Sequence, residues 1–195
     1  HISREFSFTC YFLFNTLAGI LSLFVDWRVF FINVLFSVVL WGYSHKMRKM
    51  KFLGEVGAAM LSVAPFFSLA FYYQDVTIKM FEFVAVIFVF IIAREVCKKL
   101  IGLKGDIILG DQSLPIVFGE KKASLIITGL ALLSIAQIGF FIRFLLQGEI
   151  EAIFYGMAIV LLLIAYFEGL KKAHTTVNFL YKLLILACIL TIPFI

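Results

Sequence analysis

The sequence predicts an all-α fold, a polytopic bundle of about seven transmembrane helices that forms a single domain over residues 1–195. Two observations carry this prediction: 63% of the 195 residues are hydrophobic, and the mean hydropathy is +1.07. One water-soluble core could not bury so much apolar surface, so lipid is expected to surround most of the chain. The apolar runs are continuous rather than alternating, which favours helices over barrel strands.

Seven apolar segments of about bilayer length follow one another along the chain. They cover residues 7–25, 29–43, 53–73, 80–97, 124–146, 150–167 and 177–195. Asp26 separates the first segment from the second, and Asp75 separates the third from the fourth. The second segment is short and the sixth borders on short, and both reach the length of a bilayer if they tilt or extend into neighbouring residues.

The distribution of basic residues predicts the orientation of the helices. If the N-terminus lies inside and successive connections alternate sides, 14 of the 17 Lys and Arg residues fall on the inner side, and only Arg28, Lys79 and Arg143 fall outside. Cytoplasmic connections carry such an excess. We therefore expect an integral protein of the cytoplasmic membrane with its N-terminus inside and its C-terminus outside.

The net charge of +5 does not indicate a nucleic-acid partner. A nucleic-acid binder needs its basic residues on one solvated face, whereas here they stand in short stretches between apolar runs. They are better explained as determinants of membrane topology, with membrane lipids as the expected partners.

The connection from residue 98 to residue 123 is the longest on the inner side and contains four glycines, two aspartates and Pro115. Because the outer connections are only a few residues long, function is expected on the inner face. Arg94 and Glu95 end the preceding segment, and Asp106 follows two or three turns later. Glu95 either belongs to a functional site or pairs with Lys98 or Lys99 at the membrane surface.

A second inner cluster ends the second apolar segment and contains Tyr43, Lys46, Arg48 and Lys49. Such a cluster can bind a phosphate or diphosphate through charge-assisted hydrogen bonds. It can equally be an anchor that meets anionic lipid headgroups. Both interpretations stay open from composition.

The inner connection resembles the second aspartate-rich region of the UbiA superfamily of intramembrane prenyltransferases. The matching residues keep the family order and spacing: Arg94-Glu95, Gly105-Asp106, Gly110, Ser113-Leu114-Pro115, Gly119 and Ala123. The stretch from Tyr43 to Gly54 resembles the end of the family's fourth helix, and the stretch from Ala173 to Lys182 resembles the start of its last helix. The seven segments would then be the third to ninth helices of a nine-helix bundle.

This resemblance implies transfer of an isoprenoid chain from its diphosphate to an aromatic or lipid acceptor at the inner membrane face. Two aspartate-rich motifs of the family hold Mg²⁺ on the diphosphate, and such a cation would neutralise the leaving group. By resemblance, Asp106 is the expected metal ligand, with Glu95 as a substitute ligand or a supporting carboxylate. The expected contacts to the substrate are Lys46, Arg48, Lys49, Tyr43 and Arg94.

The sequence departs from the family at both acidic motifs. The first motif would lie just before His1, so the first two helices and that motif are expected to be missing from this chain. In the second motif, Lys99 and Gly102 stand where the family has carboxylates, and only Asp106 remains. Glycine cannot ligate a metal and an ammonium opposes one. The chain as it stands is therefore expected to be a weak or inactive catalyst.

Two hypotheses follow. The first is a magnesium-dependent prenyltransferase, and the second is a catalytically degenerate member of the fold that binds lipid or acts as a scaffold beside other membrane subunits. A transporter is a third hypothesis and ranks last, because the sequence has neither internal repeats nor visibly broken helices.

Overall fold

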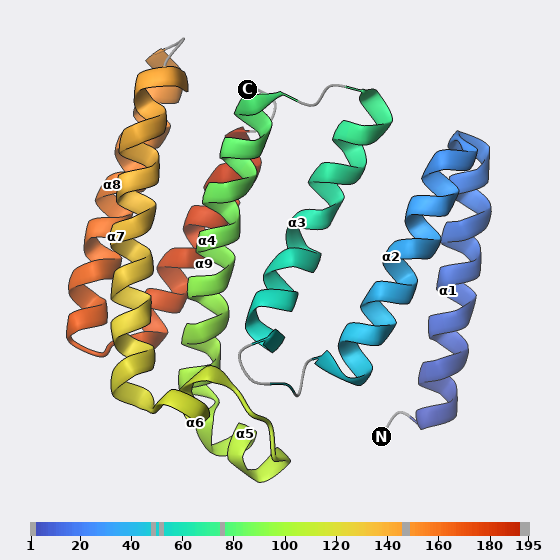
Figure 1. Ribbon diagram of the computed structural model, residues 1–195, viewed down its shortest axis with the longest axis horizontal. Coiled ribbons are helices and arrows are strands. Elements are labelled where there is room, and N and C mark those ends of the chain that lie inside the picture. The colour runs from blue at the N-terminus through green and yellow to red at the C-terminus, as the bar shows by residue number, and fades with distance from the viewer. Residues whose placement is uncertain (1–2, 48–49, 51–52, 75–76, 146–148, 192–195) are drawn as a thin grey trace.

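A computed structural model describes residues 3–47, 50, 53–74, 77–145 and 149–191 (Figure 1). Within these ranges the chain forms nine helices and no strand, which confirms the predicted all-α class. The helices are α1 (Arg4–Val25), α2 (Trp27–His45), α3 (Leu53–Tyr73), α4 (Ile78–Ile101), α5 (Leu103–Leu109), α6 (Leu114–Phe118), α7 (Glu120–Leu145), α8 (Glu149–Leu170) and α9 (His174–Thr191).

The seven long helices coincide with the seven apolar segments of the sequence. Their ends follow local capping rules, since the side chain of Ser3 accepts a hydrogen bond from the Phe6 N–H at the start of α1. Asp26 ends α1 and caps α2, because its Oδ1 accepts from the Arg28 N–H at 2.7 Å. Thr77 caps α4 in the same way.

Four helices of the described ranges are long and apolar enough to cross a membrane. The stretches that qualify are Glu5–Val25, Trp27–His45, Leu53–Tyr73 and Glu120–Phe140. Length and composition of these helices support the assignment to a membrane.

The main core lies where α4, α7, α8 and α9 pack against one another (Figure 1). Phe90 of α4 and Tyr181 of α9 are fully buried there, with their ring centroids 6.1 Å apart. A smaller core joins α3 to α4 through Ala59, Val63 and Ile87. Together these two cores make a rigid base for the last turns of α4.

The helices α1 and α2 pack against each other and project from this body, and their main contact with it is between α2 and α3 (Figure 1). No described residue of α2 is buried, and large apolar side chains such as Phe24 and Phe31 are exposed. A surface this apolar is stable only in contact with lipid or with another apolar partner.

The long connection between the fourth and fifth apolar segments contains more regular structure than the sequence suggested. Residues 98–123 complete α4, form the short helices α5 and α6 and begin α7. We refer to residues 102–119 as the α5–α6 segment. It lies at the lower end of the bundle in Figure 1, beside the ends of α4 and α7.

Candidate functional site

The α5–α6 segment is shaped by a glycine turn that brings two carboxylates together. Gly110 ends α5 in the left-handed conformation, with φ 70°. The Asp111 N–H then donates to the Asp106 carbonyl at 3.0 Å, and the Gly110 N–H donates to the Ile107 carbonyl. This is the Schellman pattern, which favours glycine at this position because glycine lacks a Cβ. The chain therefore folds back, and Asp111 returns to the side of α5 that carries Asp106.

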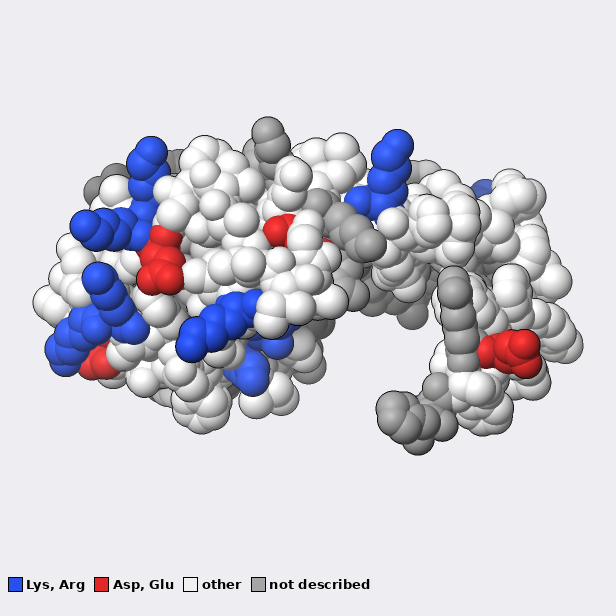
Figure 2. Space-filling model, turned by 90° about the horizontal axis from the view of Figure 1, so that it is seen from below, with Lys and Arg blue, Asp and Glu red and all other residues white. Residues whose placement is uncertain are grey.

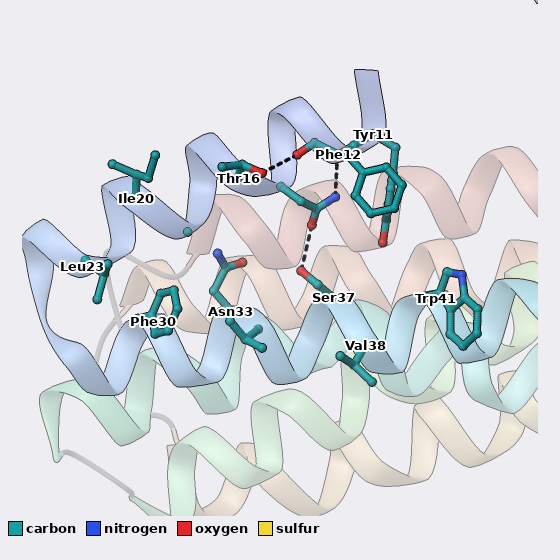
Figure 3. A pocket seen from close by; sticks show the side chains of 13 residues that line it. Tyr11, Phe12, Thr16, Ile20, Leu23, Phe30, Asn33, Ser37, Val38 and Trp41 are labelled. Atoms are coloured by element: carbon teal, nitrogen blue, oxygen red, sulfur yellow. Dashed lines mark hydrogen bonds between the residues drawn. The ribbon is translucent and has the colours of Figure 1, made fainter. Parts of the chain in front are cut away.

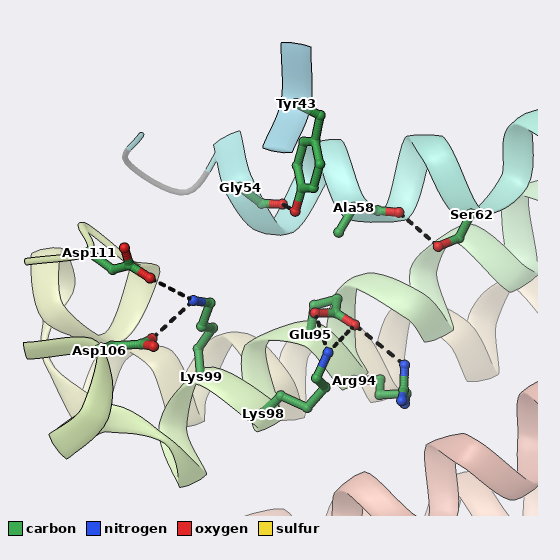
Figure 4. Close-up of polar contacts among 10 residues, drawn as sticks. All are labelled: Tyr43, Gly54, Ala58, Ser62, Arg94, Glu95, Lys98, Lys99, Asp106 and Asp111. Atoms are coloured by element: carbon green, nitrogen blue, oxygen red, sulfur yellow. Dashed lines mark hydrogen bonds and ion pairs between the residues drawn. The ribbon is translucent and has the colours of Figure 1, made fainter. Parts of the chain in front are cut away.

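Both carboxylates face the ammonium group of Lys99 on α4 (Figure 4). The Lys99 Nζ lies 3.1 Å from Asp106 Oδ2 and 3.6 Å from Asp111 Oδ2. The three side chains are between 7% and 20% exposed. Charges this poorly solvated require compensation, and here the lysine supplies it for both carboxylates.

The side chain of Glu95 lies one turn earlier on α4 and receives two cationic groups (Figure 4). The Lys98 ammonium donates to both carboxylate oxygens at 2.9 Å, and the Arg94 Nη1 lies 3.4 Å from Oε1. The pairing of Glu95 with Lys98 is therefore one of the two outcomes that the sequence left open. The expected metal ligands Asp106 and Glu95 are each engaged by a different lysine.

The start of α6 is held by a carboxylate from a distant helix. The Leu114 N–H donates to Glu55 Oε1 at 2.8 Å, and the Glu55 side chain of α3 is buried. A helix leaves its first N–H groups without internal partners, so Glu55 satisfies one of them from outside the helix. The sequence alone did not predict this role for Glu55.

Tyr43 lies between α2 and α3, away from the Lys99 ion pairs (Figure 4). Its hydroxyl donates to the Gly54 carbonyl at 2.9 Å. Its ring packs so close to Gly57 that a Cβ there would lie 3.0 Å from two ring carbons. This geometry joins α2 to α3, and a contact between Tyr43 and a substrate stays a prediction.

The remaining residues of the predicted substrate site are placed only in part. Lys46 follows the last residue of α2 and is exposed. Arg48 and Lys49 lie outside the described residues. Arg94 has a partly exposed side chain and pairs with Glu95. The structure therefore joins Arg94, Glu95, Asp106 and their lysine partners at one end of α4.

The side chains at this end do not fit a magnesium site. In the part of the chain that the structure describes, no three Asp, Glu, His or Cys side chains are grouped so that they could hold one metal ion. Asp106 and Asp111 meet an ammonium group instead, and a further cation beside Lys99 would be repelled. Magnesium binding by this chain therefore stays a prediction that rests on resemblance.

Of the apolar pockets along α1, α2 and α3, two lie between the middle parts of neighbouring helices. The larger of these two, of about 770 Å³, lies between α1 and α2 and is shown in Figure 3. Its polar feature is a hydrogen bond of 2.8 Å from the Ser37 hydroxyl to Asn15 Oδ1. The smaller, of about 300 Å³, lies between α2 and α3 beside Tyr43. Pockets of this size and polarity suit an apolar chain.

The sequence identified Asp106 and Glu95, and it offered Lys98 as one possible partner of Glu95. It did not predict that Lys99 pairs with Asp106 and Asp111, and it gave Asp111 no role. The signal that could have found them is the Gly110-Asp111 pair, since glycine after a short helix predicts a reversal of the chain.

Comparison of the chain with known protein families, with curated proteins and with solved structures found no match.

Proposed function

We propose that this chain is a UbiA-like membrane protein that binds a lipid anion at its inner face. In this proposal it serves as a lipid-binding or scaffolding subunit and does not itself carry out magnesium-dependent prenyl transfer. The observation that supports this is the position of Lys99, whose ammonium lies between Asp106 and Asp111. The cation that neutralises these carboxylates is then part of the chain, so a metal is not needed for their stability.

The proposed topology has all seven long helices crossing the membrane, with the N-terminal end of α1 inside and the C-terminal end of α9 outside. Support comes from the seven helices of 18 residues or more and from the excess of basic residues on one side. In this arrangement the α5–α6 segment lies at the inner surface.

The proposed ligand combines an anionic headgroup with an apolar chain, as in a phospholipid or an isoprenoid diphosphate. The pockets between α1 and α2 and between α2 and α3 offer about 770 and 300 Å³ of mainly apolar space. The lysines on the lower end of the bundle would attract the headgroup. Lys46, Arg48 and Lys49 stay candidate contacts for it.

The second candidate is the prenyltransferase. It is supported by the residues that keep the family order, which are Arg94-Glu95, Gly105-Asp106 and Ser113-Leu114-Pro115. In this hypothesis Asp106 and Glu95 would bind Mg²⁺, and the acceptor would be lipophilic. Lys99 would then have to release Asp106 before a metal could bind.

Calorimetry with farnesyl diphosphate as the probe separates the two candidates. The full-length protein in detergent is compared with Asp106→Asn, each in the presence of Mg²⁺ and in the presence of EDTA. We expect binding that needs neither Mg²⁺ nor Asp106, and no release of diphosphate. Binding that requires both, together with transfer of the prenyl group to a lipophilic acceptor, would establish the enzyme. If farnesyl diphosphate does not bind at all, a prenyl diphosphate is not the anionic lipid that this chain recognises.

A further inference from the structure

The short helix α5 exposes three consecutive large aliphatic side chains. Ile107 is 60% exposed, Ile108 is 85% exposed and Leu109 is 69% exposed. Their position differs from that of the exposed side chains on the long helices, because α5 lies at the end of the bundle (Figure 1). A contiguous apolar patch of this kind on a connecting segment indicates a contact surface.

The periodicity of the helix separates two faces of α5. Lys104, Ile107 and Ile108 are spaced i, i+3 and i+4, so they lie on one face. Asp106, which is only partly exposed, lies on the opposite side, and Leu109 follows it at i+3 on that side. Because Asp106 is paired with Lys99 of α4, the apolar face is directed away from the bundle. The ion pair between Lys99 and Asp106 therefore determines which face of α5 points away from the bundle.

The surroundings of α5 are basic. Figure 2 shows the molecule from the α5–α6 end, with lysine and arginine side chains gathered over the part that is formed by α4 to α9. The exposed lysines of this end are Lys98, Lys104, Lys121, Lys122, Lys171 and Lys172. An apolar strip flanked by lysines is complementary to a leaflet that contains anionic lipids.

We propose that α5 is an interfacial anchor. It inserts Ile107 and Ile108 among the acyl chains of the inner leaflet, while Lys104 contacts anionic headgroups. The partner of this surface is the lipid bilayer that surrounds the same molecule. The proposal rests on the topology given under the proposed function, and it is independent of whether the chain binds a prenyl diphosphate.

The size of the patch favours lipid over a protein partner. A stable protein interface buries about 800 Å² on each partner. One face of a helix of seven residues, carrying the two large aliphatic side chains of Ile107 and Ile108, supplies only a small part of that area. Lipid contact has no such minimum, because each side chain gains from leaving water separately.

Site-directed spin labelling tests this anchor. Ile108→Cys and Gln112→Cys are labelled separately, in a background in which Cys10, Cys97 and Cys188 are replaced by Ala. Gln112 is the matched control, since it is exposed, polar and lies beyond the Gly110 turn. The proteins are placed in nanodiscs of phosphatidylcholine, with or without phosphatidylglycerol. Frequent collisions of the spin label with oxygen show that the label lies in lipid, and frequent collisions with a water-soluble nickel chelate show that it lies in water.

We expect the label at position 108 to lose collisions with nickel and to gain collisions with oxygen, more so with phosphatidylglycerol. The label at position 112 should remain accessible to nickel in both bilayers. Adding Lys99→Met should restore nickel access at position 108, because α5 loses the contact that orients it. Equal nickel access at both positions would overturn the proposal. The proposal would also be overturned if the loss of nickel access at position 108 depended on the number of protein copies in each nanodisc and not on the lipid. That result would assign the surface to contact with a second copy of the chain.

These outcomes are separate from those of the calorimetry. Loss of farnesyl diphosphate binding leaves the labelling result unchanged. An incorrect topology is recognised in intact cells, where a membrane-impermeant thiol reagent would then reach Gln112→Cys from outside.

Discussion

The ammonium of Lys99 lies 3.1 Å from Asp106 Oδ2, and this pair joins α4 to α5. The same ammonium lies 3.6 Å from Asp111 Oδ2, beyond the Gly110 turn. One lysine therefore fixes both the helix and the turn that follows it. Lys99, which stands where the resemblance leads us to expect a carboxylate, therefore organises the segment.

Replacing Lys99 with Met should destabilise the protein by roughly 2 to 4 kcal/mol, because two poorly solvated carboxylates lose their counter-charge. Thermal or SDS-induced unfolding in detergent measures this change. Lys98→Met is the matched control. It removes an exposed partner of Glu95, for which a loss below about 1 kcal/mol is expected. Equal effects of the two substitutions would contradict the assigned role of Lys99.

Replacing Lys99 with Asp should create a site for a divalent cation. The shorter carboxylate leaves the space of the ammonium free, and Asp106 and Asp111 then supply two further oxygen ligands, which suit Mg²⁺ and Mn²⁺. Titration with Mn²⁺ followed by electron paramagnetic resonance should show binding to this variant. Lys99→Asn, which lacks the third charge, should bind much more weakly. If wild-type protein binds Mn²⁺ as well as Lys99→Asp does, the lysine is not what excludes the metal.

Replacing Glu55 with Ala should loosen the start of α6. The Leu114 N–H loses its acceptor, at a cost of about 1 to 3 kcal/mol for a buried donor. Hydrogen–deuterium exchange should show a faster Leu114 amide in this variant and little change in α7. Glu55→Gln keeps an oxygen acceptor and should preserve most of the protection. An unchanged Leu114 amide in Glu55→Ala would contradict the role of this carboxylate.

Replacing Gly57 with Ala should weaken the packing of α2 on α3. The new Cβ would lie 3.0 Å from ring carbons of Tyr43, whose hydroxyl is held by the Gly54 carbonyl. Such overpacking typically costs about 1 to 3 kcal/mol. Gly42→Ala is the control, since nothing lies within 4 Å of its Cβ, and it should be neutral or stabilise by up to about 1 kcal/mol. Thermal unfolding compares the stability of the two variants. If Gly57→Ala is as stable as Gly42→Ala, the contact between the Tyr43 ring and Gly57 does not limit the packing of α2 on α3.

The topology predicts opposite labelling of the two ends of the bundle. Tyr73→Cys, at the end of α3, should react with a membrane-impermeant maleimide from outside the cell. Gln112→Cys, in the α5–α6 segment, should react only in inverted vesicles. Both positions are exposed, so a lack of reaction is not explained by burial. Labelling of both positions from the same side would rule out the seven-span arrangement.

The helical class and the positions of the long helices were predictable from sequence because they depend on local properties. A run of about 20 apolar residues in lipid must form a helix, since each backbone group needs a hydrogen-bond partner within the run. Asp26 and Thr77 are capping residues that mark helix starts without any tertiary information. The short helices α5 and α6 were not predicted, because helices of seven and five residues are stable only through contacts with the rest of the fold.

The sequence by itself determined an all-helical chain with seven long apolar helices, and it pointed to Asp106 and Glu95 as residues of interest. Only the tertiary structure decided which groups meet: Lys99 with Asp106 and Asp111, Lys98 with Glu95, and Glu55 with the start of α6. The physical reason is that burial of a chain segment in lipid follows from its own composition. The partner of a charged side chain follows instead from helix phase, from the Gly110 turn and from contacts between residues as far apart as Glu55 and Leu114.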